Sequence, residues 1–577
     1  MTRPHPARRG LNRRQALASL AGSGVAGGAF GAHADTAPAR FVHGVASGDP
    51  YADSVLLWTR ITPPDGAHLQ PVRLRWEVSE SADFARLAAS GDYLATHERD
   101  HTVKVVAEGL QPGRWYHYRF VSEAGEVSPV GRTRTLPPHD SRDPVVWAVA
   151  SCSLHPNGYF NAYQAIADLD RVDAVLHLGD YIYEYGAAAG DYGMRNGLAL
   201  GRVPEPAHEI VTLGDYRQRH AQYKADPQLQ AAHARAPWIV VYDDHEITND
   251  PWVEGAQNHQ PELEGDWATR KATALRAYYE WMPIRDPGTG VGLSAATMRD
   301  FRFGQVASLH MVETRLLART RQLSYGRDLN WSEDASGRRV ADVEAFERLR
   351  QDPSRQLLGE SQIGWIEAST RAAVAHGCVW QVLGNQVVTA RVRAPNLRRV
   401  LGDDMINMAL ASVDDATRPR LQQMVEQYDL GLPVNLDSWD GYPAERERLY
   451  GALRRAGARP VVLAGDSHSF WVNTLSDEAG EKLGIEFGTT AISSPSPSAS
   501  AMLPGFEIGQ VIAAQNEEVE YVDFGPRGFL KLTLTPEAVT GELVGVSTIT
   551  EPRFQTTVIR SYRAEAVAGG VGPLRQI

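Results

Sequence analysis

The chain of 577 residues has only two cysteines, Cys152 and Cys378, and this scarcity excludes a disulfide framework and a cysteine-rich zinc module. The body of the chain has no run of about 18 or more apolar residues, which excludes a protein with several membrane-spanning helices. Basic residues are the minority, with 58 Lys and Arg against 70 Asp and Glu and a net charge of -12. Binding to nucleic acid through phosphate contacts needs a basic face, so no nucleic-acid binding, sequence-specific or otherwise, is expected.

The overall composition is that of a globular protein. Hydrophobic residues make up 43% and charged residues 22%, with 52 Gly and 34 Pro, which supplies apolar material for a sizeable core and rules out wholesale disorder. At about 150 residues per domain, the length corresponds to roughly three or four domains, or to two of which one is large.

An export signal is predicted in residues 1–34, which have five Arg, no Lys and no acidic residue. The pair Arg13-Arg14 precedes an apolar run rich in Gly and Ala at 18–30, and the Ala-His-Ala sequence at 32–34 is a small-x-small cleavage site. This pattern is typical of a twin-arginine signal peptide, and the alternative is a disordered start rich in Ala and Arg. We therefore expect the twin-arginine machinery to export the chain to the periplasm or the extracellular space, with no transmembrane segment after signal removal.

Residues 40–136 are predicted to form an all-β domain. The stretches 72–78 and 103–106 alternate apolar and polar residues with the period of a half-buried strand. A turn at 110–113 leads into the alternating aromatic stretch 115–121, which resembles the tyrosine corner of immunoglobulin and fibronectin sandwiches. We expect a small immunoglobulin- or fibronectin-like sandwich that serves as a stability module. The alternatives are that this domain forms one wall of the site or that it binds a surface polymer.

After a linker at 137–141 the pattern changes to alternating strands and helices. Continuous apolar runs predict buried strands, and helical stretches lie between them. This alternation predicts a layered α/β domain over 145–548. Residues 549–577 lack a core pattern, and either a lid over the site or a frayed tail is expected there. The predicted strands are 145–150, 174–178, 238–242, 305–312, 379–383 and 461–464, and the predicted helices are 160–169, 214–235 and 266–281.

Polar side chains that can bind metal follow five of these strands. Because ligand sites of α/β sheets form outside the carboxyl ends of the strands, the five clusters are expected to meet at one edge. Together they offer thiolate, carboxylate, phenolate, amide and imidazole groups, which are metal ligands. In chain order the clusters contain Cys152; Asp180 and Tyr183; Asp243, His245 and Asn249; Asn385; and Asp466 and His468.

Each cluster taken alone has an ordinary structural explanation. A Gly-Asp after a strand is often a turn, and Asp243 can begin a helix whose dipole favours acidic residues. A single cysteine is more often a small buried apolar residue. Cys152 could instead form a disulfide with Cys378, although Cys378 lies in an apolar stretch typical of a core. Five such clusters in one chain nevertheless favour a metal site.

Longer segments around these clusters resemble a known family. A Gly-Asp-x-x-Tyr at 179–183, an Asn after a strand and a late Gly-x-x-His at 465–468 are similar to the calcineurin-like metallophosphoesterases, which include the purple acid phosphatases. More closely, the chain resembles the PhoD family of alkaline phosphatases and phosphodiesterases over nearly all of its length after the signal. The matching segments are 41–50, 57–60, 150–153, 177–184, 243–246, 437–442, 464–468 and 489–495.

The resemblance implies a metallophosphatase fold of two packed mixed sheets flanked by helices. It also implies a site with one ferric ion, Fe(III), and two Ca²⁺ ions, Zn²⁺ being a less favoured substitute. Phenolate and thiolate donors stabilise a ferric ion, and carboxylate and amide oxygens suit Ca²⁺. By position, the implied ligands are Cys152, in a place where relatives with zinc often have Asp; Asp180, bridging two metals; Tyr183, a phenolate on iron; Asn249 on the second metal, with Asp243 nearby; and Asp466 with His468, the latter on iron.

For three further residues, a structural role is the alternative to a functional role. His245 either binds phosphate or orients its own loop. Arg315 either binds phosphate or forms a structural ion pair. Asn385 touches metal or substrate, or else satisfies backbone groups at its strand end. Together with Asp180 and Asn249, His245 and Arg315 are the expected catalytic residues.

The resemblance implies a secreted hydrolase of phosphoric esters. Monoesters and diesters are both expected substrates, with a metal-activated water attacking phosphorus in line and no phosphoenzyme. The expected substrates are small phosphate esters, phospholipids and wall polymers. Within this class of enzyme, the alternative is a phospholipase D-like phosphodiesterase that acts on phospholipid headgroups or wall polymers. From other classes, the alternatives are a non-catalytic surface-binding protein with a structural metal centre and, less favoured, an iron–thiolate redox protein.

Overall fold

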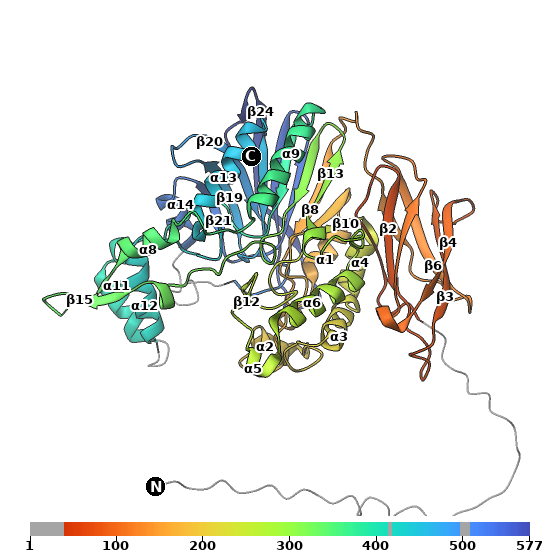
Figure 1. Cartoon of the computed structure of the whole chain (residues 1–577), viewed down its shortest axis with the longest axis horizontal. Coiled ribbons are helices and arrows are strands. Elements are labelled where there is room, and N and C mark those ends of the chain that lie inside the picture. Colours follow the sequence, from red (N-terminus) through yellow and green to blue (C-terminus); the bar gives the residue numbers. More distant parts are fainter. Residues whose placement is uncertain (1–39, 338, 414–417, 497–507) are drawn as a thin grey trace, which may run out of the picture. The chain divides into compact units, whose positions relative to one another are not determined.

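Two mixed β-sheets packed face to face form the centre of the fold in a computed structural model, which describes residues 40–577 except 338, 414–417 and 497–507 (Figure 1). Within these residues, the first sheet consists of eleven strands and the second of seven. The first contains Val45–Gly48 (β1), Ser54–Arg60 (β2), Thr102–Glu108 (β5), Val145–Ala150 (β8), Ala174–His177 (β9), Trp238–Val240 (β10), Arg527–Leu534 (β22), Ala538–Val546 (β23), Thr556–Val567 (β24), Gly570–Val571 (β25) and Arg575–Gln576 (β26). The second contains Arg299–Phe303 (β13), Ala307–Met311 (β14), Trp380–Gly384 (β17), Pro460–Ala464 (β18), Phe470–Ser476 (β19), Lys482–Gly488 (β20) and Val519–Asp523 (β21). The strand orders are β25-β24-β23-β22-β8-β9-β10-β1-β2-β5, with β26 on β24, and β13-β14-β17-β18-β20-β19-β21.

Apolar side chains between the two sheets explain why these runs become strands. β8, β9 and β10 run parallel to one another, and so do β14, β17 and β18. Every residue of β8 and of β14 is buried, as is usual for parallel strands covered on both faces. Leu176 and Ile239 of the first sheet share one hydrophobic cluster with Leu309, Val382 and Leu463 of the second. The six buried strands predicted from the sequence are confirmed.

Helices cover the outer face of each sheet (Figure 1). Asp226 separates two of them, because its side chain accepts hydrogen bonds from the first backbone N–H groups of the second helix, which begins with Pro227. The predicted helical stretch at 214–235 is therefore two helices. Those against the first sheet are α1 (Asn161–Ala167), α3 (Leu213–Lys224), α4 (Pro227–Arg235) and α6 (Trp267–Trp281), and those against the second include α9 (Glu360–Ala375) and α13 (Pro443–Arg455).

The N-terminal strands form two sheets, of which one continues into the central sheet. β1 lies parallel to β10, with Gly48 opposite Trp238, and β2 and β5 follow outward. Tyr116 makes the predicted tyrosine corner, since its Oη accepts a hydrogen bond from the backbone N–H of Gln111 at 2.8 Å. A separate four-stranded sheet, which shares a hydrophobic cluster with β1, β2 and β5, contains β3 (Val72–Ser79), β4 (Leu87–Ala95), β6 (Trp115–Ser122) and β7 (Gly131–Arg134).

The predicted fold class, a layered α/β domain preceded by an all-β region, is confirmed. Pro38–Ile577 form one compact unit, so the domain boundaries at 40–136 and 145–548 stay a prediction. The predicted signal peptide at 1–34 lies outside the described residues. Among the residues that the structure describes, none of the helices combines the length and the apolar character that a membrane crossing requires.

The C-terminal segment forms an edge of the first sheet, which corrects the expectation of a lid over the site or a frayed tail at 549–577. β24 pairs antiparallel with β23 and carries β26 on its other side. Tyr562 and Ala564 belong to the hydrophobic cluster between the sheets, whereas Val558 is 48% exposed. An edge strand of this kind buries one face over only part of its length, so its sequence shows few large apolar residues.

Candidate metal centre

The predicted ligand residues lie where parallel strands of both sheets end. Contacts between the two sets of loops show that these strand ends meet: Tyr183 Oη lies 3.2 Å from His468 Nε2, and Arg315 bonds to Asp243. This convergence follows from the parallel arrangement, in which neighbouring strands end at the same edge. In chain order the loops hold Cys152 after β8, Asp180 and Tyr183 after β9, Asp243 after β10, Arg315 after β14, Asn385 after β17, and Asp466 and His468 after β18.

Four of these residues have a left-handed backbone conformation, which residues other than Gly rarely adopt. A conformation of this kind costs about 1–3 kcal/mol and persists where the surrounding structure fixes it, often at functional sites. Gly179, with a φ of 109°, permits a close approach between loops, because a Cβ there would lie 2.3 Å from Cβ of Asp243. The four φ angles are 62° at Cys152, 57° at Asp180, 56° at Asp466 and 55° at His468.

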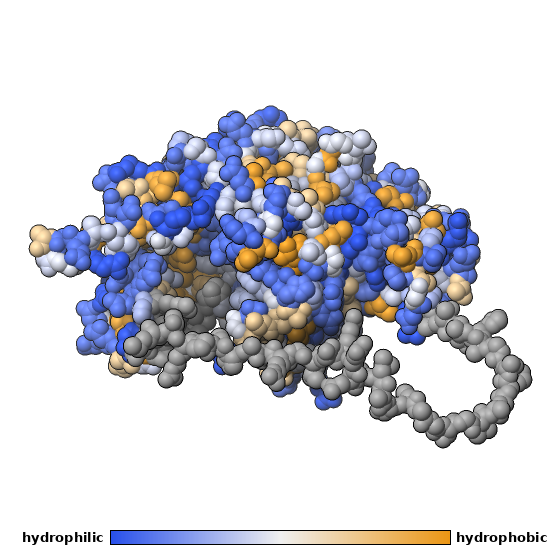
Figure 2. Space-filling view, turned by 60° about the horizontal axis from the view of Figure 1, so that its bottom comes forward, coloured by the Kyte–Doolittle hydropathy of each residue, from blue (hydrophilic) through white to orange (hydrophobic). Residues whose placement is uncertain are grey.

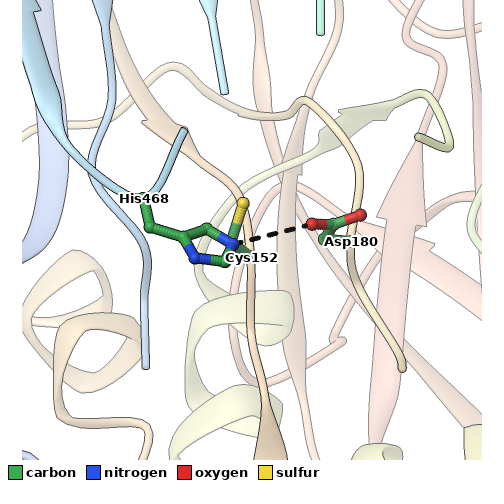
Figure 3. A group of neighbouring side chains, drawn as sticks. All are labelled: Cys152, Asp180 and His468. Carbon is green, nitrogen blue, oxygen red and sulfur yellow. Dashed lines mark ion pairs between the residues drawn. The ribbon is translucent and has the colours of Figure 1, made fainter. Parts of the chain in front are cut away.

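Cys152, Asp180 and His468 form the first group of candidate ligands (Figure 3). Each offers one ligand atom, and these atoms lie within 4.8 Å of one another. The side chains come from three different loops, and His468 Nε2 lies 3.9 Å from Asp180 Oδ2. Tyr183 adds a fourth donor, since its Oη lies 2.9 Å from the same Asp180 oxygen. A thiol, a carboxylate, an imidazole and a phenol thus face one small volume, and such a donor set suits a transition metal.

Hydrogen bonds orient the two rings of this first group. The carbonyl oxygen of Pro495 lies 2.7 Å from Nδ1 of His468, so Nδ1 carries the proton and the Nε2 lone pair faces the other donors. Burial lowers the pKa of His468 to about 3, which keeps the imidazole neutral and able to bind a metal. Ser494 Oγ donates to Tyr183 Oη at 2.7 Å. Burial and the neighbouring carboxylate raise the pKa of the Tyr183 phenol, so its proton stays until a cation displaces it.

Asp243, Asp244 and Asp466 form a second group, with carboxylate oxygens within 4.8 Å of one another. A third group, Asp180, Asp244 and His245, joins it to the first. Oδ2 of Asp243 is buried and, among the described residues, has no hydrogen-bond partner. Burial raises the pKa of Asp243 to about 6, and burial together with repulsion from Asp244 raises that of Asp180. The site thus has an excess of buried carboxyl groups, and one carboxyl oxygen has no hydrogen-bond partner among the described residues. Both features fit the binding of metal cations.

Arg315 is the fully buried cation of the cluster, and its guanidinium bonds three carboxylates. Nε donates to Asp243 Oδ1 at 2.5 Å, Nη1 to Asp437 Oδ2 at 2.7 Å and Nη2 to Asp466 Oδ1 at 3.1 Å. The three hydrogen bonds use three of the five N–H donors and pair the charge with carboxylates, so they favour the ion-pair interpretation of Arg315 over phosphate binding. We interpret it as a positioning residue for the carboxylates.

Replacing Arg315 by Lys is expected to weaken metal binding and lower kcat/KM by about 10- to 100-fold, because one ammonium group cannot reproduce the planar contacts of a guanidinium. Replacing it by Met is expected to destabilise the metal-free protein by about 3–5 kcal/mol, because buried carboxylates lose their partner. Chelator competition, kinetics and thermal unfolding measure these effects. Arg321→Lys, at an exposed arginine, is the control. Unchanged metal affinity in Arg315→Lys would contradict the positioning role.

His245 lies between the ligand groups and is held by Glu184. Its Nδ1 lies 2.7 Å from Glu184 Oε2, and its ring packs against that of Tyr183 with the centroids 4.2 Å apart. Burial opposes a charge on His245, but the carboxylates of Asp244 and Glu184 outweigh burial and raise its pKa. The ring therefore stays protonated beside the candidate ligands, with Nε2 4.0 Å from Asp244 Oδ1.

Glu246 ties the loops after β9 and β10 together. Its Oε2 accepts hydrogen bonds from the backbone N–H groups of Asp180 and Asp243, both at 3.0 Å, and its Oε1 accepts one from Tyr181 at 2.7 Å. Reasoning from the sequence missed this role, as well as Asp244 among the candidate ligands and the partners Glu184 and Asp437. The sequence held little signal for these roles, because acidic residues that are adjacent in one loop cannot be told apart until the fold determines where each side chain points.

Two predicted residues have their side-chain amides engaged elsewhere. The side-chain NH₂ group of Asn249 donates to Gln257 Oε1 at 3.0 Å near the surface. The role of Asn249 as a metal ligand stays a prediction. The amide of Asn385 donates to the carbonyl oxygen of Val387, and its Oδ1 accepts a hydrogen bond from Trp439 Nε1 at 3.3 Å. These contacts favour the structural interpretation of Asn385 at its strand end.

The two cysteines have different surroundings. Cys152 belongs to the first ligand group, whereas Cys378 lies just before β17, where its Sγ donates to the carbonyl oxygen of Gly304 at 3.2 Å. Both are buried and free, so the alternative of a disulfide between them is wrong. The prediction that Cys378 belongs to the core is confirmed.

Known proteins share both the sequence and the fold of this chain. The family model described as PhoD-like phosphatase matches residues 147–543, and the model of the N-terminal domain of that family matches residues 27–137. Alkaline phosphatase D of Bacillus subtilis (strain 168) is 33% identical over 557 residues, which cover 92% of this chain and 84% of that protein. A solved structure of PhoD is 30% identical, with a TM-score of 0.74 and coverage of 94% of this chain and 92% of the other. The chain therefore belongs to the PhoD-like phosphatase family.

Proposed function

We propose that this chain is an exported, metal-dependent hydrolase of phosphomonoesters and phosphodiesters. The observation that carries the proposal is the convergence of Cys152, Asp180, Tyr183 and His468 with a second, carboxylate-rich group. Membership of a phosphatase family, and 33% identity to an alkaline phosphatase, support phosphoester hydrolysis. The composition of residues 1–34 supports export by the twin-arginine machinery.

The donor set favours one ferric ion with calcium neighbours. The thiolate, phenolate, imidazole and carboxylate of the first group would hold Fe(III), because strong anionic donors stabilise a highly charged ion. Asp243 and Asp466, with Asp180 shared, would hold Ca²⁺ through oxygen atoms, and Asn249 is the proposed amide ligand. Burial and the charge of Asp180 raise the pKa of the Cys152 thiol, so metal uptake at this group releases protons.

Metal ions bound there supply a water of lowered pKa and positive charge that stabilises the phosphoryl group in the transition state. The residues of the chain orient the site and hold its protons. His468 presents Nε2 because its Nδ1 is bonded to Pro495. His245, kept protonated by Asp244 and Glu184, can donate from Nε2 to a phosphoryl oxygen or to the leaving oxygen.

Metal content and turnover together test the proposal. Protein exported and purified without chelators is expected to contain about one iron and about two calcium ions per chain. It should release nitrophenolate from both 4-nitrophenyl phosphate and bis(4-nitrophenyl) phosphate. About two zinc ions and no iron would refute the assignment of Cys152 and Tyr183 to Fe(III). A metal-loaded protein that hydrolyses neither ester would refute the function.

Replacing Tyr183 by Phe is expected to remove the visible absorption band that a phenolate on Fe(III) produces, and to weaken iron binding by about tenfold or more. The remaining thiolate, imidazole and carboxylate would still hold some iron, so absorption spectra can be compared at equal iron content. Tyr185→Phe is the matched control, because the Tyr185 ring also packs near His245, with centroids 5.4 Å apart, but lies outside the ligand groups. An unchanged spectrum in Tyr183→Phe would exclude this residue as a ligand.

A further inference from the structure

A pocket of about 550 Å³ lies beside the candidate metal centre, and nothing in the proposed chemistry uses it. Its volume lies within the range of about 300–1,000 Å³ that is usual for small-molecule sites. Apolar residues form most of its lining, which consists of Val388, Val392, Met424, Tyr428, Val434, Asn435, Ser438, Asp440, Ser467, Trp471, Ile508, Ile512 and Phe524.

Two loops of the metal centre form walls of this pocket. Ser467 lines it and stands between Asp466 and His468, which are candidate ligands of the two groups. Because consecutive Cα atoms are about 3.8 Å apart, this wall is within one residue of both ligands. Trp471 also lines the pocket, and its Nε1 donates to Ser467 Oγ at 3.0 Å.

A second wall comes from the loop that holds Arg315. Ser438 lines the pocket directly after Asp437, whose Oδ2 accepts a hydrogen bond from Arg315 Nη1 at 2.7 Å. The pocket and the candidate metal centre therefore share two loops, and this sharing is the geometric basis for placing part of a bound ester in the pocket.

The chemistry of the lining favours an apolar occupant. Its carboxylate, Asp440, is bonded to Arg446 at 3.0 Å and to the backbone N–H of Val392 at 2.8 Å. Ser438 Oγ donates to the carbonyl oxygen of Asn435 at 2.9 Å. Among the described residues that line the pocket, none is Lys or Arg, so it offers no cation to a second phosphate. These polar groups are satisfied within the protein, which leaves apolar contact as the main interaction on offer.

We propose that this pocket binds an alkyl or aryl group of the substrate, so that the enzyme prefers phosphoesters carrying such a group over small hydrophilic ones. The proposal rests on the proposed function and names its substrate class. On the molecular face drawn in Figure 2, hydrophilic residues predominate and hydrophobic ones form separate patches. The apolar lining of the pocket shares two loops with the metal centre, so it can bind part of a molecule whose phosphoryl group is held there.

A matched pair of diesters tests the preference. 4-Nitrophenyl methyl phosphate and 4-nitrophenyl octyl phosphate have the same leaving group and reacting centre, and differ only in the alkyl chain. With the metal-loaded enzyme, and below the concentration at which the octyl ester forms micelles, kcat/KM for the octyl ester is expected to be at least about tenfold higher. Burial of two methylene groups of the octyl chain suffices for a factor of this size. Equal values for the two esters would overturn the proposal.

Val434 is the residue to change, because it is half-buried in the pocket lining and lies outside the metal-ligand groups. Val434→Asp is expected to reduce the octyl preference to about twofold or less, with the methyl ester hydrolysed as by the unchanged protein. Val434→Trp, which fills the pocket without adding charge, is expected to reduce the octyl preference in the same way. It replaces Val434→Asp in the test if that variant folds poorly. Val558→Asp, at an exposed valine of β24, is the control and should keep the full preference. An octyl preference that persists in both folded Val434 variants would overturn the proposal.

Calorimetry with methylphosphonate and octylphosphonate measures the same preference without turnover. Octylphosphonate is expected to bind the metal-loaded protein at least about tenfold more tightly, and Val434→Asp should remove the difference. If neither ester is hydrolysed but the octyl preference in binding remains, the proposed hydrolysis fails and the apolar subsite stands. If both esters are hydrolysed and both phosphonates bind equally, the subsite fails and the hydrolase stands.

Discussion

Replacing Asp180 by Asn is expected to lower kcat/KM for phosphoesters at least about 10³-fold, because one residue serves two ligand groups. Its Oδ2 lies 2.9 Å from Tyr183 Oη, and its Oδ1 accepts a hydrogen bond from the backbone N–H of His245 at 3.4 Å. The amide keeps the size of the carboxylate but removes a negative charge that a shared metal ligand needs. Steady-state kinetics and metal content per chain measure the loss.

The same substitution is expected to stabilise the metal-free protein at neutral pH. Burial and repulsion from Asp244 raise the pKa of Asp180, so its ionised form is unfavourable without a cation. Thermal unfolding after chelation would show this gain, which separates a lost ligand from a damaged fold. Asp300→Asn, at an exposed aspartate, is the control and should change activity less than about twofold. If Asp180→Asn kept a tenth of the activity at full metal content, the chemistry would have to lie elsewhere.

Metal removal is expected to abolish activity and to destabilise the protein more at pH 7 than at pH 4. Burial raises the pKa of Asp243 to about 6 and those of Glu246 and Asp250 to about 7, against ordinary values near 4. Between about pH 4 and pH 7 the folded chain keeps protons that the unfolded chain has lost. The contribution of these three carboxyls to the free energy of unfolding therefore decreases across this window, by on the order of 1.4 kcal/mol for each pKa unit of a group. Buried histidines away from the site, such as His177, whose pKa burial lowers to about 3, add the opposite slope in the chelated and the metal-loaded protein alike.

With metal bound, this loss is expected to be absent, so the difference in stability between the metal-loaded and the chelated protein widens as pH rises. Cations bind the ionised carboxylates, so deprotonation strengthens binding and the bound metal stabilises the folded chain. Asp244 does not alter this contrast, because His245 and Arg315 outweigh burial and lower its pKa, which places its contribution in the acid range below the window. Thermal unfolding of the chelated and the metal-loaded protein from pH 4 to pH 8 measures both slopes. Parallel curves would contradict a metal centre at this cluster.

Much of the fold could be predicted because its centre has an unambiguous pattern. A strand such as β8 is buried along its whole length, so it appears in the sequence as a continuous apolar run. β24 gave no such signal, since it lies at an edge and exposes much of its surface. The pairing of β1 with β10 could not be predicted either, because one short strand contains no information about a partner nearly two hundred residues away.

The candidate site was predictable where each strand end carried its own signal. Cys152, Asp180 and His468 follow three different strands, and the parallel arrangement alone brings them together. The choice between adjacent residues was not predictable. In the loop after β10, Asp244 faces the ligand groups while Glu246 binds backbone N–H groups, and only tertiary structure distinguishes the two acids. Arg315 could be located from its strand, but its three carboxylate partners come from distant segments.

The position of β22 determines when this protein can fold. β22 lies between β8 and β23, with Leu530 opposite Val149, so β8, the strand that precedes Cys152, lacks one neighbour until residues 527–534 have been made. Contacts between such distant segments slow folding, and partly made sheets with open edges tend to aggregate. The sheet and its metal-binding edge can therefore be completed only once residues 527–534 have been made, and a chain shortened before β22 would expose β8 as an unpaired edge.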